Sequence, residues 1–211
     1  YSSAASDVYK RQVLGPGLNM KRNPLCGRNF EYFSEDPLLT GKLAAAQLRG
    51  MRRFGVTGTI KHFACNNQEF KRTEIDSVLS ERALREIYLR AFETAVKEGG
   101  AYSVMSTYGG LNGIWTASNF DLLTTILRDE WGFEGHVVSD WSLYDYTNKN
   151  QAFYAGTDVN LTTTLTTGQM QDAESATAVK AMRRCMHHYL YSIANSNAMN
   201  GKPPTVRVTY K

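Results

Sequence analysis

The sequence alternates short apolar runs with longer segments of helical periodicity, and this alternation limits the possible folds more than any single residue does. The strand candidates cover residues 13–20, 56–64, 102–108, 136–140 and, more weakly, 155–161. The helical patterns cover residues 36–55, 80–98, 118–131 and 172–195. Strands that alternate with helices of this length form right-handed βαβ units around a parallel sheet. The sequence therefore predicts an α/β fold.

Three of the predicted helices have a recognisable first residue. Asp36 precedes Pro37, and proline is favoured at the first position of a helix. Ser80 is the expected cap of the second helix. Ser118, with Asp121 three positions later, has the pattern of a capping box before the third helix. We expect the helices to begin at these residues.

Polar residues stand at the carboxyl ends of three predicted strands. They are Lys61-His62, Ser106-Thr107-Tyr108 and Ser139-Asp140. In a (β/α)8 barrel the strand ends converge on one active-site face, so that fold would bring all three groups together. The sequence lacks the G-x-G-x-x-G and G-x-x-x-x-G-K-[ST] motifs of nucleotide-binding folds. Because a complete barrel needs eight strands and about 250 residues, we predict an incomplete (β/α)8 TIM-type barrel.

The chain has 211 residues and begins with Tyr1 rather than methionine. Its first 12 residues, YSSAASDVYKRQ, are polar and aperiodic, and we set residues 1–12 aside as an unmatched tail or sequence artefact. Residues 13–211 are assigned to one partial barrel domain. We expect the chain to be a piece of a longer protein.

Composition and charge exclude several classes of function. Lysine and arginine are scattered and the net charge is only +4, so we expect no nucleic-acid surface. No segment approaches the roughly 18 to 20 apolar residues of a membrane-spanning helix. The three cysteines have no C-x-x-C spacing, which predicts reduced thiols and no zinc site. The free cysteines slightly favour the bacterial cytoplasm, but the sequence does not determine the compartment. Cys185, His187 and His188 on the last helix have no spacing suited to a metal, and we read them as surface or packing residues.

Asp140 is the strongest candidate for a catalytic group. It follows the buried strand residues Val137 and Val138, and Trp141 comes directly after it. A carboxylate can stabilise the oxocarbenium-like centre of a reacting sugar, while an indole can stack on the C–H face of the ring. The alternative is that Asp140 only caps the next turn.

Lys61 and His62 form a second candidate group. Together they can donate several hydrogen bonds to neighbouring hydroxyl groups of a ligand, while Phe63 faces the packed side of the strand. A buried, structural histidine beside a surface lysine is the alternative. A lysine desolvated at the mouth of a barrel could also form a Schiff base. Arg28, in a loop that contains Gly27, is a candidate forked donor.

Five stretches in this order resemble the barrel domain of glycoside hydrolase family 3, the β-glucosidase and β-xylosidase family. They are GPGLNMKRNPLCGRNFEYFSEDP (15–37), IKHFACNNQE (60–69), SERALREIYLRAFETAVKEGG (80–100), VMSTYGGLNG (104–113) and LRDEWGFEGHVVSDW (127–141). The N-acetylglucosaminidase branch has KHFPGHG where this chain has KHFACNNQE, so the sequence is more similar to the β-glucosidases.

The resemblance implies roles for six residues of this sequence. Asp140 matches the catalytic nucleophile of the family, and Trp141 an aromatic residue of its pocket. The residues that match those close to the sugar are Arg28, Lys61, His62 and Tyr108. The usual Tyr-Asn of the family is replaced here by Tyr108-Gly109.

The implied activity is retaining hydrolysis of a small β-linked oligosaccharide or aryl β-glycoside, without metal or organic cofactor. Arg28 and Lys61 are expected to hold Asp140 ionised. In the β-glucosidase branch the acid/base is a glutamate of an α/β sandwich domain, which lies outside this chain together with the early strands of the barrel. We therefore expect the 211-residue chain alone to be inactive. A Schiff-base lyase that uses Lys61 and a sugar-binding module without turnover are the alternatives.

Overall fold

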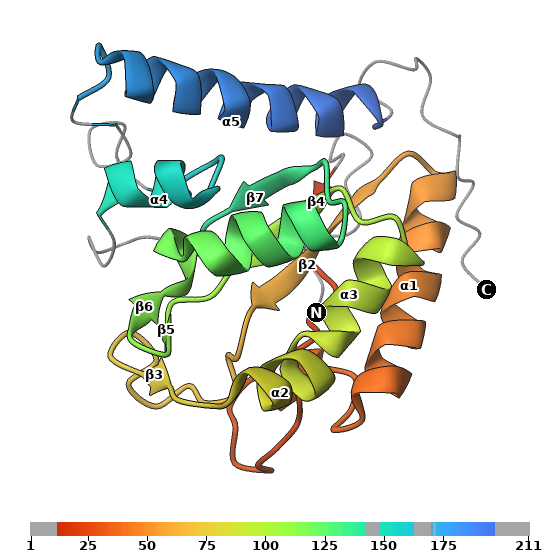
Figure 1. Ribbon diagram of the computed structural model, residues 1–211. Coiled ribbons are helices and arrows are strands. Elements are labelled where there is room, and N and C mark those ends of the chain that lie inside the picture. The colour runs from red at the N-terminus through yellow and green to blue at the C-terminus, as the bar shows by residue number, and fades with distance from the viewer. Residues whose placement is uncertain (1–11, 142–147, 163–169, 171, 197–211) are drawn as a thin grey trace.

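A parallel sheet forms the centre of the computed structural model, which describes residues 12–141, 148–162, 170 and 172–196 (Figure 1). Its four strands lie in the order β1-β2-β4-β7 and all pair in parallel. They are β1 (Gln12–Val13), β2 (Thr57–Phe63), β4 (Ser103–Ser106) and β7 (His136–Val138). Gln12, which the sequence pattern placed with the tail, forms β1 with Val13; residues 1–11 lie outside the described part.

The fifth predicted strand is reduced to one parallel bridge between Val138 and Val159. The side chain of Asp158 explains why the ladder stops there. Its carboxylate accepts a hydrogen bond from the backbone N–H of Val137 at 2.7 Å, while the Asp158 N–H donates to the Val137 carbonyl. A side chain thus replaces part of the backbone pairing, and residues 155–161 do not form a regular strand.

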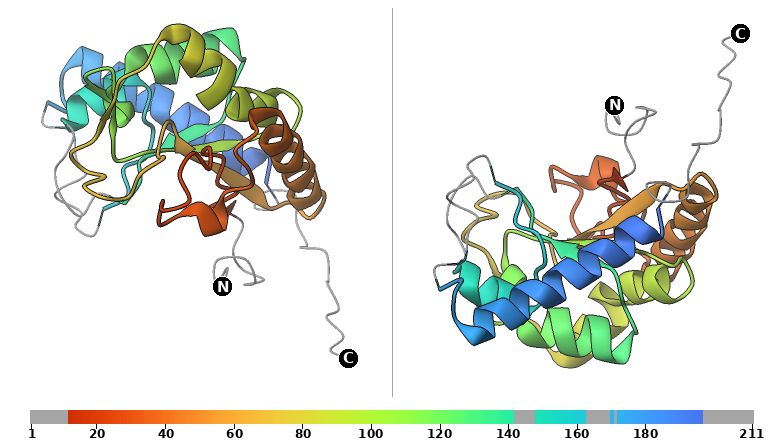
Figure 2. Two further views of the ribbon diagram at one scale, coloured as in Figure 1. Left: turned by 90° about the horizontal axis from the view of Figure 1, so that it is seen from below. Right: turned by 90° about the horizontal axis from the view of Figure 1, so that it is seen from above.

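Helices cover the outside of the sheet (Figures 1 and 2). The long ones are α1 (Pro37–Arg53), the continuous run of α2 (Glu81–Ala83), η2 (Leu84–Tyr88) and α3 (Arg90–Lys97), then η4 (Asp121–Glu130) and α5 (Ala176–Ala194). Helices α1 and α3 pack on each other and on β2, and α5 packs on β7. This arrangement of a parallel sheet inside a helical layer is that of an incomplete (β/α)8 TIM-type barrel, as predicted.

The sequence pattern missed the smaller elements. They are the 3-10 turns η1 (Asn29–Glu31) and η3 (Thr116–Ser118), the helix α4 (Lys149–Ala155), and a sheet of β3 (Asp76–Ser77), β5 (Gly110–Leu111) and β6 (Ile114–Trp115). Two-residue strands carry too little periodicity to be recognised from sequence.

The predicted caps are correct for two of the three helices. Asp36 accepts a hydrogen bond from the N–H of Leu39, and Ser80 accepts one from the N–H of Ala83. The prediction for Ser118 is wrong, because this residue ends η3 and its hydroxyl makes no hydrogen bond within the described residues. Asn119 takes the role instead, since its side chain accepts from the N–H of Leu122 at 3.0 Å.

The core lies between the sheet and the helices. Phe63 of β2 is fully buried and meets the rings of Phe92 and Trp131 edge to face, with centroids 5.1 and 5.9 Å apart. Gly41 lets α1 approach α3, because a Cβ at this position would lie 2.8 Å from the Cβ of Thr94. Burial of Phe63 on the packed side of β2 leaves the carboxyl end of the strand to present its polar neighbours. Within the described residues, no helix has the length and apolar character needed to cross a membrane.

Candidate active site

Polar residues near the end of β2 and just after β7 meet at the carboxyl end of the sheet. The Nε2 atom of His62 lies 3.6 Å from Oδ2 of Asp140, although β4 separates the two strands. This separation is too long for a hydrogen bond, so the two groups face each other without being bound. Both side chains are enclosed, with 1% of His62 and 14% of Asp140 exposed.

The two carboxylate oxygens of Asp140 have different surroundings. Oδ1 accepts a hydrogen bond from the backbone N–H of Trp141 at 2.7 Å. Oδ2 is buried and accepts no hydrogen bond from any described residue. One oxygen thus fixes the orientation of the group, while the other keeps its lone pairs for a ligand or a reacting atom.

The backbone of Lys61 and His62 is placed by neighbouring elements. The pairing of β2 with β4 shifts register between Ile60 and Phe63, and such an irregularity re-aims the side chains inside it. The buried amide of Asn19 holds the backbone of His62 from both sides. Its oxygen accepts from the His62 N–H at 2.8 Å, and its nitrogen donates to the His62 carbonyl at 2.9 Å.

Glu31 joins the two predicted sugar-binding cations. Its Oε2 lies 3.0 Å from Nζ of Lys61, and its Oε1 accepts a hydrogen bond from Nε of Arg28. Only 13% of the Lys61 side chain and about a fifth of the other two are exposed. One carboxylate therefore fixes a lysine and an arginine in place, and its negative charge offsets part of theirs.

Burial raises the pKa of Asp140 above the ordinary range of an aspartate, even though the N–H of Trp141 and the charges of Arg28, Arg72 and Lys61 act in the opposite direction. The expectation that Arg28 and Lys61 would hold Asp140 ionised is therefore incomplete. Both cations favour the carboxylate, but desolvation of the carboxylate outweighs them while Glu31 neutralises part of their field.

The pKa of the His62 imidazole is shifted in the opposite direction, downward. Burial lowers its pKa well below the usual value, and the charges of Arg28, Lys61 and Arg72 lower it further. His62 is therefore a neutral ring at neutral pH. A neutral imidazole carries one N–H donor and one acceptor nitrogen, so its contribution to the site depends on which nitrogen holds the proton.

A chain of polar side chains lies behind His62. Tyr32 Oη is 3.1 Å from His62 Nδ1, and the Asn66 amide donates to Tyr32 Oη at 2.9 Å. The same amide nitrogen donates to Glu69 at 2.9 Å, and the Asn66 oxygen accepts from Thr107 at 3.3 Å. These groups link β2 to the loops that follow β2 and β4.

Tyr108 and Trp141 form an open rim. The Tyr108 hydroxyl donates to the Trp141 carbonyl, which connects the end of β4 to the end of β7. The Arg72 guanidinium stacks on the Tyr108 ring at 4.6 Å from its centroid and also pairs with Glu69 at 2.7 Å. The Trp141 residue is 41% exposed, so its ring is accessible from solvent.

All six residues singled out from the sequence thus lie at this end of the sheet. Sequence reasoning missed Glu31, Tyr32 and Arg72. A signal for Glu31 exists, since it stands three residues after Arg28 and pairs with it. Asn66 and Glu69 belong to an amide-rich segment that the sequence shows but does not connect to His62. Nothing local in the sequence indicates that Arg72 folds back onto Tyr108.

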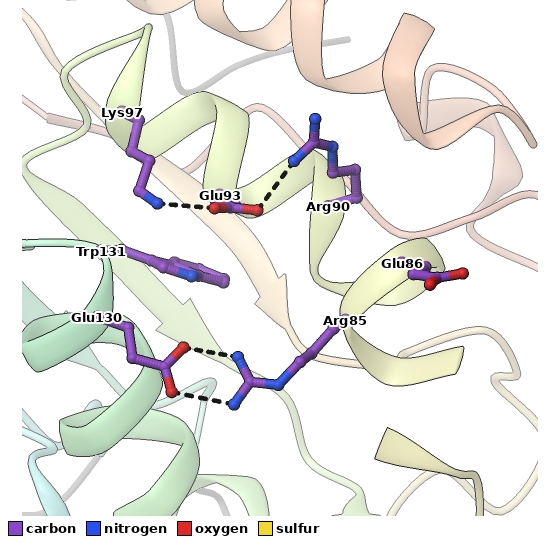
Figure 3. A pocket seen from close by; sticks show the side chains of 7 residues that line it. All are labelled: Arg85, Glu86, Arg90, Glu93, Lys97, Glu130 and Trp131. Carbon is purple, nitrogen blue, oxygen red and sulfur yellow. Dashed lines mark hydrogen bonds and ion pairs between the residues drawn. The ribbon is translucent and has the colours of Figure 1, made fainter. Parts of the chain in front are cut away.

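A separate hollow of about 440 Å³ lies on the outer helices (Figure 3). Trp131 lines it, and the charged side chains around it pair with one another. Arg85 holds Glu130 through two nitrogens at 2.6 and 3.0 Å, and Glu93 accepts from both Lys97 and Arg90. Because these charged side chains already pair with one another, the hollow has fewer groups available to bind a ligand than the strand ends have.

No group of three or more histidine, cysteine or acidic residues in the described part is arranged to hold a metal ion. Cys26, Cys65 and Cys185 are free thiols. His188, which the sequence pattern placed among surface or packing residues, donates from Nδ1 to Oδ1 of Asp158 at 2.8 Å, and the other oxygen of Asp158 pairs with Arg128 at 2.7 Å. This buried network ties the last helix to the sheet.

Comparison with known proteins identifies the family of the chain. The family profile described as "Glycosyl hydrolase family 3 N terminal domain" matches residues 3–189. The chain belongs to glycosyl hydrolase family 3. Its sheet and outer helices are therefore part of the TIM-type barrel of that family.

Two curated sequences and one solved structure illustrate what this family 3 chain is similar to. It is 64% identical over 129 residues to a β-glucosidase of Ruminococcus albus and 54% identical over 129 residues to an exo-α-(1→6)-L-arabinopyranosidase of Bifidobacterium breve. These matches cover 61% of this chain, but only 14% and 17% of the relatives. A β-glucosidase structure from Bifidobacterium adolescentis superposes with a TM-score of 0.85 at 39% identity, covering 94% of this chain and 30% of that one. The chain thus spans less than a third of these proteins.

Proposed function

We propose that the protein to which this chain belongs hydrolyses terminal β-D-glycosides, as a β-glucosidase-type enzyme, with retention of configuration and with Asp140 as nucleophile. The observation that carries the proposal is the Asp140 carboxylate, held through Oδ1, with a buried Oδ2 that accepts no hydrogen bond from the described residues. Membership of family 3 and the β-glucosidase names among the relatives support this class of substrate.

In the first step Oδ2 of Asp140 attacks the anomeric carbon and forms a covalent ester, while the bond from that carbon to the leaving oxygen breaks. A carboxylic acid outside the described residues gives its proton to the leaving oxygen. In the second step a water attacks the same carbon, the acid group recovers a proton from that water, and Asp140 is released. Two inversions give net retention.

The cations and His62 fit the hydroxyl groups of the sugar in the subsite next to Asp140. Lys61 and Arg28 present charged donors whose hydrogen bonds strengthen as the ring flattens toward the transition state. Glu31 fixes both before the substrate arrives, so little ordering is left to the reaction itself. The exposed Trp141 ring offers a stacking face for a sugar or an aryl group, with Tyr108 beside it. The favoured substrates are small β-linked oligosaccharides and aryl β-glycosides.

The acid/base group is assigned to another part of the longer protein, a glutamate of an α/β domain. Among the carboxylates that approach the site, Glu31 is paired with Lys61 and Arg28, and Glu69 with Arg72. Neither stands ready to protonate a leaving group. The 211-residue chain by itself should therefore give no measurable turnover of a nitrophenyl β-glucoside, whereas the longer protein should; substantial turnover by the chain alone would refute this assignment.

The lyase alternative gains no support from the environment of Lys61. A Schiff-base lysine is activated by an apolar pocket or a neighbouring cation. The nearest charged partner of Lys61 is instead the carboxylate of Glu31, whose Oε2 lies 3.0 Å from Nζ, and this contact is neither of the two.

Replacement of the nucleophile tests the proposal in the longer enzyme. Asp140→Ala should lower the rate of hydrolysis on the order of 10⁴-fold, and added azide should restore cleavage of an activated β-glucoside by attack from the vacated face. The product should be the α-glycosyl azide. Asp129→Ala, an exposed carboxylate on η4, is the matched control and should retain normal activity. Wild-type turnover by Asp140→Ala would overturn the assignment.

A further inference from the structure

We propose that Tyr32 is a positioning residue that fixes the tautomer of His62, so that the proton of the imidazole stands on Nε2 and faces Asp140. This inference rests on the proposed function, because it gives that N–H a role at the reacting sugar. It follows from the order of donors and acceptors in the chain of side chains behind the ring.

The direction of these hydrogen bonds is fixed first at Asn66. Its amide nitrogen lies 2.9 Å from Oε1 of Glu69, which as a carboxylate can only accept. The amide oxygen accepts from the Thr107 hydroxyl at 3.3 Å. A flipped amide would place its oxygen against the Glu69 carboxylate, with two acceptors in contact. Glu69 therefore fixes which end of the Asn66 amide points inward.

The orientation of Asn66 then decides what Tyr32 does. The same amide nitrogen donates to Tyr32 Oη at 2.9 Å, so the phenol oxygen is used as an acceptor on that side. A phenol has a single proton, and the remaining partner of Oη is Nδ1 of His62 at 3.1 Å. The hydroxyl therefore donates to Nδ1. Burial of the hydroxyl raises the pKa of Tyr32, so it keeps this proton across the neutral range.

An Nδ1 that accepts a hydrogen bond carries no proton, and a neutral imidazole then holds its proton on Nε2. This atom lies 3.6 Å from Oδ2 of Asp140, which accepts no hydrogen bond from the described residues. The Nε2–H is thus directed at the open oxygen without being bound tightly to it. A sugar hydroxyl placed beside the pair, within hydrogen-bond distance of both atoms, can accept from Nε2–H and donate to the carboxylate.

The cations around the ring prevent the alternative of a doubly protonated His62. Arg28, Lys61 and Arg72 all act against a positive imidazole, and burial acts in the same direction. Were the ring charged, Nδ1 would be a donor and would meet the hydrogen of Tyr32. The hydrogen-bond order and the charges therefore point to the same neutral tautomer.

The direct test is nitrogen NMR of the chain with ¹⁵N-labelled histidine. In the wild-type chain, the Nδ1 resonance of His62 should have the downfield position of an unprotonated nitrogen, and Nε2 that of a protonated one. A correlation from the Tyr32 hydroxyl proton to Nδ1 should be visible. A protonated Nδ1 in the wild-type spectrum would overturn the proposal, and this measurement requires no substitution.

Tyr32→Phe removes only the hydroxyl and should shift His62 to a mixture of tautomers. Tyr154→Phe, which removes an exposed hydroxyl on α4 that donates to Asp172, is the matched control and should leave His62 unchanged. An unchanged His62 tautomer in a folded Tyr32→Phe chain would show that other groups set it, and would also overturn the proposal.

In the longer enzyme, Tyr32→Phe should lower kcat/KM for a β-glucoside roughly 3- to 10-fold, the effect of losing one hydrogen bond. This result is separable from the role of Asp140. If Asp140→Ala keeps wild-type turnover, the proposed function fails while the tautomer is still decided by the spectrum. If Asp140→Ala is inactive and Tyr32→Phe leaves both the spectrum and the rate unchanged, only the role of Tyr32 fails.

Discussion

His62 Nε2 faces Asp140 Oδ2 across 3.6 Å, although the two residues leave strands that are not neighbours. Strand β4 lies between β2 and β7 in the sheet, so the two side chains approach each other across its carboxyl end. The pair joins a neutral imidazole to a carboxylate whose second oxygen accepts no hydrogen bond from the described residues. This relationship suits the binding of a polar ligand with hydroxyl groups that the proposed function requires.

The charge of Glu31 should control the pH dependence of activity in the longer enzyme. Glu31→Gln removes the negative charge between Arg28 and Lys61, so a stronger positive field acts on Asp140. A positive field favours the carboxylate and lowers its pKa, so the acid limb of kcat/KM should move to lower pH. Full pH profiles of kcat/KM measure this shift.

The matched control for that variant is Glu98→Gln, which removes a carboxylate paired with Lys42 on the surface. Its acid limb should coincide with that of the wild-type enzyme. An acid limb of Glu31→Gln that stays in place or moves to higher pH would contradict the role given to Glu31.

Asp140 should reduce the stability of the folded chain at neutral pH. Burial raises its pKa in the folded state above the unfolded value of about 3.9. The folded state therefore binds this proton more tightly, and the resulting stability is present below the unfolded pKa and lost as pH rises through the folded pKa. Asp140→Asn should then raise the Tm at pH 7 by roughly 2–4 °C, as about 1 kcal/mol does in a chain of this size.

The gain from Asp140→Asn should shrink as the pH falls toward 3, where the wild-type carboxyl is protonated as well. Thermal unfolding of both proteins at several pH values measures the difference. An equal Tm at all pH values, or a less stable Asp140→Asn at pH 7, would show that the buried carboxylate costs the fold nothing.

The buried network on Asp158 should contribute far more to stability than the surface ion pairs. Its carboxylate is fully enclosed and receives Arg128 at 2.7 Å, His188 at 2.8 Å and the N–H of Val137 at 2.7 Å. Asp158→Asn leaves the charge of Arg128 buried without its partner. We expect a loss of about 3–5 kcal/mol in the free energy of unfolding.

Urea denaturation of the chain measures that loss. Glu98→Gln, which breaks the exposed pair with Lys42, is the reference and should cost less than about 1 kcal/mol. Similar losses for the two variants would show that burial does not increase the contribution of the Asp158 network to the free energy of unfolding.

Sequence periodicity predicted the barrel and the position of its strand ends because apolar strands and amphipathic helices are local patterns. The same local patterns identified Lys61, His62 and Asp140, because these residues stand at the ends of buried apolar runs. The prediction failed at Ser118 because two adjacent polar residues compete for one cap, and the 3-10 turn η3 decides in favour of Asn119.

Local sequence patterns could not identify the side chains that contact the site residues. Tyr32 meets His62 across 30 positions, and Asn66 meets Thr107 across 41. These contacts depend on how the loops after β1, β2 and β4 fold over the sheet. The direction of the Asp140 pKa likewise depends on the balance between burial and three distant cations, which only the folded chain sets.

Trapping of the covalent intermediate tests the central claim most directly. The longer enzyme is incubated with an activated 2-deoxy-2-fluoro β-glucoside, digested, and analysed by peptide mass spectrometry. The role assigned to Asp140 predicts a single sugar adduct on its carboxylate, accompanied by loss of activity. An adduct on any other residue would contradict the assignment of the nucleophile.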